Sequence, residues 1–199
     1  MFELPVQLEV NGKLHPIRNN GDFRVVLDCF AALNDVELDD IDRILSSLII
    51  FYEEAESEAS LNELFNRDIR PAAEKMFWFF SCGDNVVGNK HNYKLVDWEK
   101  DQQLIASAIN KAAGTEIRSL DYLHWWTFMG YYTAIGDCTW SNVVAIRQKI
   151  KTGKKLEKNE LKFKNDNPEY FVWDSHTIAD KEAENSLFDL WNNDEEDDE

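Results

Sequence analysis

The sequence predicts a mainly α-helical fold: a compact helical bundle with an N-terminal β-hairpin and a disordered, acidic C-terminal tail. Residues 121–135 are apolar almost throughout, apolar residues recur at helical spacing elsewhere, and the composition turns polar and acidic after residue 173. A helix that is apolar on every side is normally buried, so we expect residues 121–135 to form a central helix. Asp121 and His124 interrupt this short segment, which argues against a membrane span.

The N-terminal segment has the pattern of a β-hairpin. Residues 6–10 alternate between apolar and polar side chains, Asn11-Gly12 is a strong turn signal, and residues 13–17 resume on the other side. Pro16 predicts an edge or an early end of the second strand. Because a two-stranded hairpin is marginal alone, we expect it to lie on the helices that follow.

Two amphipathic helices are expected next. Asp22 is placed to cap the first, which should end near residue 34, and Asp39 or Asp40 to cap the second. The apolar stripe of the first helix consists of Phe23, Val26, Leu27 and Phe30. That of the second consists of Ile41, Ile44, Leu45, Leu48, Ile49 and Tyr52.

Further helices are predicted on both sides of a polar loop at residues 84–94. Arg70-Pro71 begins one that ends at Gly83, since proline suits a first helical turn. Asp97 is placed to cap another, which Ala113-Gly114 closes. The connection to the central helix is short and predicts that the two helices run antiparallel. A last amphipathic helix follows, with Trp140, Val143, Val144 and Ile150 as its apolar positions.

Charge divides the chain into two predicted parts: a helical domain with its hairpin over residues 1–173 and an acidic tail over 174–199. The formal net charge is −17, and the tail contributes −10 of it through eleven acidic residues and one lysine. This balance disfavours binding to nucleic acid or to an anionic membrane, so partners should be basic. A basic sector runs from Arg147 to Lys164.

The remaining composition indicates an intracellular protein without a metal. Cys29, Cys82 and Cys138 are far apart, which favours reduced core residues, and the first residues lack the pattern of a signal peptide. The four histidines lie on separate predicted elements without metal-ligand spacing, and no nucleotide-binding glycine motif is present. We expect no cofactor.

His124 is the most prominent candidate for catalysis. Asp121 lies three residues before it, on the same side of a continuous helix, and can in principle orient it as a general base. No sequence signature nominates a nucleophile, so we interpret His124 as a core residue and expect no enzymatic activity. Trp125 and Trp126 are either an exposed binding platform or part of the core, and we favour the core.

The acidic tail contains a candidate partner-binding segment formed by Leu187, Phe188, Leu190 and Trp191. In a disordered tail these residues cannot bury themselves cheaply, yet together they can anchor in a groove while the flanking acids steer the encounter. The alternative is that they fold back onto the protein's own basic sector. The sequence leaves both interpretations open.

The central segment also resembles a known family. Leu123, His124, Trp125, Trp126 and Phe128 match the LHWWxF signature of the gene-product-fifteen family of tailed bacteriophages. Weaker matching blocks lie at residues 10–24, 78–83 and 97–108, so that the resemblance covers about residues 6–150. The acidic extension is not part of this pattern.

The resemblance implies a tail-assembly chaperone in the host cytoplasm. Its partners would be the tape-measure protein, the major tail protein or both, with no small-molecule substrate and with self-association left open. An alternative of another class is an acidic DNA mimic that inhibits a host DNA-binding protein. The charge distribution argues against a mimic, because most of the excess lies in the predicted flexible tail.

Overall fold

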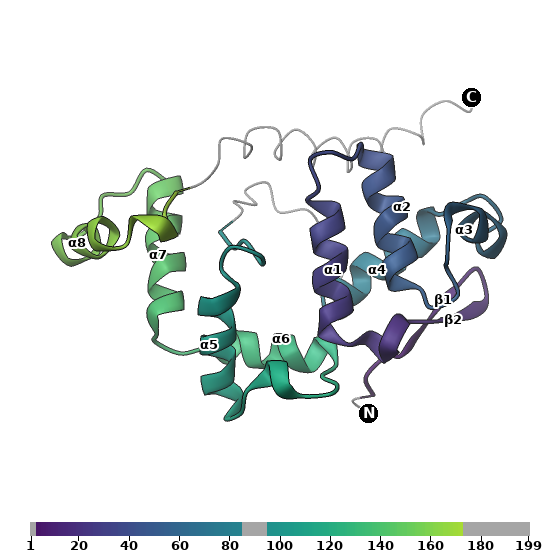
Figure 1. Ribbon diagram of the computed structural model, residues 1–199, viewed down its shortest axis with the longest axis horizontal. Helices are drawn as coiled ribbons and strands as arrows, with labels where there is room; N and C mark the ends of the chain where they lie inside the picture. Colours follow the sequence, from purple (N-terminus) through teal and green to yellow (C-terminus); the bar gives the residue numbers. More distant parts are fainter. Residues whose placement is uncertain (1–2, 85–94, 173–199) are drawn as a thin grey trace. The chain divides into compact units, whose positions relative to one another are not determined.

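The computed structural model describes residues 3–84 and 95–172 and confirms a mainly helical fold with an N-terminal antiparallel hairpin (Figure 1). Its contacts divide the chain into two units, Met1–Lys155 and Leu156–Glu199, which are treated separately below. The polar loop at 85–94 and the acidic tail lie outside the described residues. In the part of the chain that the structure describes, no helix has both the length and the apolar character of a membrane span.

The hairpin forms as predicted, from β1 (Gln7–Val10) and β2 (Lys13–Pro16). Asn11 and Gly12 both have positive φ, at 52° and 78°, which is the backbone of a tight hairpin turn whose twist matches that of the strands. Leu8 and Val10 are buried, and β1 packs against helix α4 (Arg70–Phe80). The hairpin therefore gains its stability from the helical body, as expected.

Helices α1 (Phe23–Leu33) and α2 (Asp40–Phe51) pack side by side, with Asp22 and Asp39 as their caps, as predicted. The predicted stripe of α2 is partly wrong, since Ile41 is 65% exposed. The contact instead centres on the buried Ser47, whose hydroxyl donates to the Cys29 carbonyl at 3.2 Å. This small residue lets the helices approach. Ile41 lies in the first turn of α2 and is exposed at that end of the helix, whereas Leu48 on the same face is completely buried.

Arg18 fastens the end of α2 to the turn that follows the hairpin. Its guanidinium donates to the carbonyls of Ile49, Ile50, Tyr52 and Ala55 at 2.8–3.0 Å. The last carbonyls of a helix have no partners within the helix, so one planar cation satisfies several of them together. The short helix α3 (Glu58–Leu64) then leads to α4, which begins at Arg70-Pro71 as predicted.

Helix α5 (Gln102–Ala113) starts later than predicted and ends at Gly114, as predicted. Asp97 does not cap it: its carboxylate accepts from the Glu99 and Lys100 amides in a preceding turn. The residue before the helix is Asp101, whose carboxylate is bonded to Arg147 and so makes no side-chain cap. Trp98 consequently lies outside the helix, where its ring contacts those of Phe30, Trp125, Phe128 and Tyr132.

The predicted central helix is shorter than the apolar segment. After the 3-10 turn η2 (Ile117–Ser119), helix α6 spans only Trp125–Thr133, and Figure 1 shows it crossing α5 instead of running antiparallel to it. The helix starts late because residues 121–123 are not helical. Their backbone bonds to the start of α1, with the Phe23 amide donating to the Leu123 carbonyl at 2.9 Å. Within α6 only Trp125 and Phe128 are buried, so the helix is not enclosed on every side.

The chain continues into α7 (Thr139–Lys151), which is capped by Cys138. In the second unit, α8 (Lys158–Asp166) and the 3-10 turn η3 (Pro168–Tyr170) follow. Helix α8 lies within the stretch from Arg147 to Lys164, for which the sequence predicted only a basic sector.

Replacing Arg18 by lysine tests the fastening of α2. An ammonium group cannot reach four carbonyls arranged for a planar guanidinium, so we expect Arg18→Lys to lower the free energy of unfolding by about 2 kcal/mol. Urea unfolding monitored by circular dichroism measures it. The control is Arg118→Lys, because Arg118 pairs with Glu116 in solvent and its replacement should leave the midpoint nearly unchanged. Equal effects of the two substitutions would contradict the role of Arg18.

Candidate functional site

The residues of the LHWWxF signature meet where α1, α4 and α6 converge. Leu123, His124, Trp125 and Phe128 are buried, and Trp126 is half-buried. Phe128 stacks on Phe23 of α1 with ring centroids 4.7 Å apart. The structure thus brings all five predicted signature positions into one packed junction.

His124 is the N-cap of α6, and both its ring nitrogens have partners. Nδ1 accepts the Trp126 amide hydrogen at 3.0 Å, which requires the proton to sit on Nε2, and Nε2 then donates to the Pro5 carbonyl at 3.0 Å. Burial lowers the pKa of His124 from its ordinary value of 6.5, which favours this neutral ring. Asp121 is exposed and precedes the helix, so the helical spacing that would pair it with His124 does not exist.

Asp22 completes the junction from the side of α1. One carboxylate oxygen accepts the Arg24 amide hydrogen at 3.0 Å and caps α1, while the other accepts the Leu123 amide hydrogen at 2.8 Å. The Leu123 carbonyl in turn accepts from Phe23. Gly21 lies directly beside this exchange with φ of 77°, and a Cβ there would come 2.7 Å from the Phe79 ring. A residue with a side chain would therefore clash at this position.

The two tryptophans bond to the end of α4. The Trp125 indole donates to the Phe80 carbonyl at 2.9 Å, and the Trp126 indole donates to the Phe79 carbonyl at 3.0 Å. These carbonyls are among those that a helix end leaves unsatisfied. Because both indole N–H groups are used internally, the pair joins α6 to α4. The Trp125 ring is buried, and the half-buried Trp126 ring contacts those of Trp78 and Phe79.

A buried ion pair joins α5 to α7. The Arg147 guanidinium donates to both oxygens of Asp101, at 2.6 and 2.8 Å, and to the Leu95 carbonyl at 2.9 Å. Both side chains are almost completely buried. Arg147 therefore does not belong to an exposed basic sector, which corrects the prediction for its first residue.

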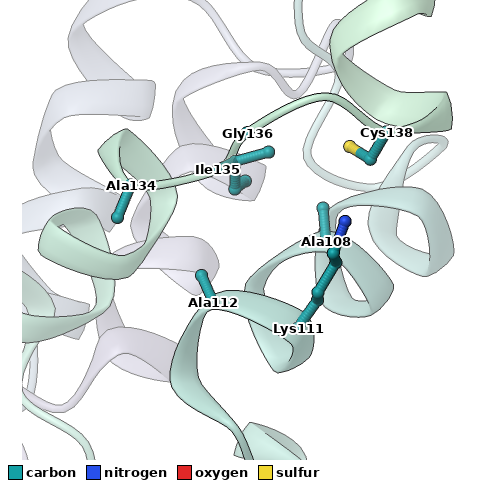
Figure 2. A pocket seen from close by; sticks show the side chains of 7 residues that line it. All are labelled: Ala108, Lys111, Ala112, Ala134, Ile135, Gly136 and Cys138. Atoms are coloured by element: carbon teal, nitrogen blue, oxygen red, sulfur yellow. The ribbon is translucent and has the colours of Figure 1, made fainter.

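A small cleft lies between α5 and the α6–α7 connection. Figure 2 shows Ala108 and Ala112 of α5 facing Ala134 and Ile135, with Lys111 and Cys138 at the rim. The cleft holds about 190 Å³ and is lined mainly by small apolar side chains. It is smaller than typical small-molecule sites, which begin near roughly 300 Å³, and it contains no arrangement of acid, base and nucleophile.

A second, wider cleft of about 440 Å³ lies beside the hairpin. His15 lines it and its Nδ1 is 3.1 Å from Glu54 Oε2, an arrangement that resembles an oriented base. Ser60 is the hydroxyl on this lining, but it accepts the Ser57 amide hydrogen and donates to the Ser57 carbonyl at the start of α3. The hydroxyl is thus committed to capping a helix and is not presented to His15 as a nucleophile.

The metal ligands, the cysteines and the predicted partner-binding residues can be examined only where the structure describes them. Across residues 3–84 and 95–172, no three histidine, cysteine or carboxylate side chains converge to hold a metal ion. The three cysteines are free, with Cys29 buried. The predicted partner-binding residues Leu187, Phe188, Leu190 and Trp191 lie outside the described residues.

The family model of the bacteriophage Gp15 protein matches residues 1–167 of the chain. The chain belongs to this family. Membership implies a role in the structural, head–tail module of a bacteriophage. Neither the curated proteins nor the solved structures yielded a match to the chain.

The extent of the match corrects the expected boundary of the resemblance. The sequence pattern ended near residue 150, whereas the family model continues to residue 167 and so includes α8. The extension that follows the match therefore starts after α8. The matching blocks at residues 78–83 and 123–128 contact one another in the fold. The Trp125 and Trp126 indoles of one block donate to the Phe80 and Phe79 carbonyls of the other.

The buried cap predicts a pH dependence of stability. Because the folded protein keeps His124 neutral with a lowered pKa, the unfolded chain binds more protons below about pH 6.5, so acid favours unfolding. The stabilisation of the folded protein by neutral His124 is fully present above pH 6.5. It is lost as the pH falls towards the lower pKa that His124 has in the folded protein. We expect His124→Asn, which keeps a capping side chain and cannot titrate, to flatten this dependence.

Urea midpoints measured from about pH 8 to about pH 5 test this expectation, with the difference between wild type and variant isolating His124. As the pH is lowered, the urea midpoint of the wild type should fall more steeply than that of His124→Asn. Parallel curves for the two proteins would show that His124 is not held neutral by the fold.

Proposed function

We propose that this Gp15-family protein is a tail-assembly chaperone that binds the tape-measure protein, the major tail protein or both in the host cytoplasm during tail morphogenesis. The observation that carries the proposal is the family match over residues 1–167, which covers the entire first unit. A chaperone of this kind needs a stable body and a surface for a partner, and no chemical step.

The described body has the character of a scaffold. Several of its buried polar groups fasten one element to another: Asp22 joins α1 to the start of α6, His124 joins α6 to Pro5, and Asp101 and Arg147 join α5 to α7. Buried polar groups that are fully engaged in this way specify one arrangement of helices. They support a binding role, because none of them is left poised to exchange a proton with a substrate.

The proposed partner contact is the segment of Leu187, Phe188, Leu190 and Trp191 in the acidic tail. Aromatic and aliphatic side chains that enter a partner's groove supply most of the affinity of such contacts, and tryptophan is common among them. The surrounding carboxylates would increase the rate of encounter with a basic partner. The same charge disfavours nucleic acid as the partner.

Co-expression with the tape-measure protein of the same phage tests the proposal. We expect the two proteins to co-purify. Replacement of the four apolar tail residues by serine should weaken the complex at least about tenfold, because each anchor lost from an interface centre costs about 1–2 kcal/mol. Pull-down followed by titration calorimetry measures both results. The same assay with the major tail protein distinguishes the two partners.

Val36→Ser combined with Ile41→Ser is the matched control. Val36 and Ile41 are also exposed apolar residues among acids, but Val36 lies on the α1–α2 connection and Ile41 in the first turn of α2. This variant should bind with affinity close to that of wild type. Failure of both candidate proteins to co-purify or to gain solubility would remove the basis of the chaperone proposal.

A further inference from the structure

The second unit lacks a core of its own in its described part. Between residues 156 and 172 no side chain is buried, and the aromatic residues Phe163, Tyr170 and Phe171 are only half-buried. Phe163 and Phe171 contact one another with ring centroids 6.3 Å apart. Apolar groups in this segment thus remain partly in water, where each costs free energy.

Helix α8 is also short for a helix that buries so little. An isolated helix below about 12–15 residues is marginal in water, and α8 has nine. Its ends are well capped: the Glu157 amide donates to the Glu160 carboxylate at 2.8 Å, and the Asn167 side chain donates to the Phe163 carbonyl at 2.9 Å. Capping alone contributes about 1 kcal/mol at each end, so packing against a further segment would be needed to hold the helix firmly.

The exposed face of α8 indicates the chemistry of that segment. Lys158, Leu161, Lys162 and Asn165 lie at helical positions i, i+3, i+4 and i+7, and all four are exposed. Leu161 is 49% exposed, and Val172 beyond the helix is 66% exposed. A face with apolar side chains between lysines fits a segment that carries apolar and acidic residues together.

We propose that the occupant of this face is the protein's own tail segment of Leu187, Phe188, Leu190 and Trp191. These residues supply the apolar groups that residues 156–172 lack, and Asp189 with the tail's other acids complements Lys158 and Lys162. The described part of the second unit ends at Val172, and Leu187 is the fifteenth residue after it. An extended chain of that length reaches roughly 50 Å, whereas α8 is only roughly 14 Å long.

Connection in one chain favours this occupant over a separate molecule. Two segments joined by a short linker in one chain meet at an effective concentration of about a millimolar, which favours their contact over one with a separate molecule at lower concentration. A second copy of the protein would have to overcome the repulsion between two chains of net charge −17. The tail therefore occupies α8 within its own molecule.

This docking would add a regulatory step to the proposed function. The regulatory role rests on that proposed function, whereas the docking itself does not. The segment that contacts the partner would be covered in the free protein, and a partner would have to displace it from α8. The apparent affinity for the partner is then the intrinsic affinity multiplied by the fraction of molecules whose segment is free. Covering the segment also protects its anchor residues from unrelated surfaces before the tail is built.

Hydrogen exchange of the full-length free protein tests the docking. We expect the amides of Lys158–Asp166 to exchange at least about tenfold faster when Leu187, Phe188, Leu190 and Trp191 are replaced by serine, because α8 loses its packing. Lys158→Glu combined with Lys162→Glu should have the same effect, and adding it to the serine variant should change little further. The amides of α7 report on the body and should remain unchanged.

The matched charge control is Lys13→Glu with Lys75→Glu, which makes the same change of charge at two exposed lysines of the first unit. It should leave exchange in α8 as in wild type. Equal exchange of α8 in wild type and in the serine variant would overturn the docking while leaving the co-purification test of the chaperone intact. Protection of α8 that increases with protein concentration would overturn it in favour of a second copy.

Discussion

The exchange of backbone hydrogen bonds between Asp22 and the residues before α6 is the constraint on which the body depends. Asp22 caps α1 and at the same time accepts from Leu123, while the Leu123 carbonyl accepts from Phe23. One carboxylate thereby fixes the beginnings of two helices that are far apart in sequence. His124 then caps α6 and holds Pro5, so the N-terminal segment is fixed by the same junction.

Two further helices, α2 and α4, are held by groups that satisfy helix ends. Trp125 and Trp126 bond to the last carbonyls of α4, and Arg18 bonds to those of α2. Buried carbonyls without partners are costly, so each of these contacts both removes a penalty and sets the position of a helix. The conspicuous aromatic signature is therefore explained by architecture.

Local signals were sufficient for much of the fold. The Asn11-Gly12 turn, the caps Asp22 and Asp39 and the terminator Gly114 act within a few residues, and the elements that they predicted are present. The start of α6 could not be predicted, because bonds to residues about a hundred positions away compete with helix formation in residues 121–123. Arg18 was missed for the same reason, since its acceptors lie 31–37 residues further on.

The candidate site was predictable to a lesser degree. Sequence alone indicated that His124 is structural, yet it could not show that both ring nitrogens bond to backbone groups. Arg147 looked like one member of a basic sector, because nothing in its neighbourhood reveals that Asp101 lies opposite it. Helix α8 was hidden by its polarity, since its apolar residues are too few to form a stripe.

The long separation in the Asp22–Leu123 and Pro5–His124 contacts has a consequence for synthesis. These bonds span 101 and 119 residues, so they cannot form until more than half of the chain has left the ribosome. Contacts that close such large loops form late in folding. Until then the hairpin and α1 can form only local contacts, and the segment around Pro5 is among the last to be fixed in place. Truncated products that end before α6 would therefore expose the apolar faces of α1 and α4, which makes them substrates for proteases and folding factors of the host cell.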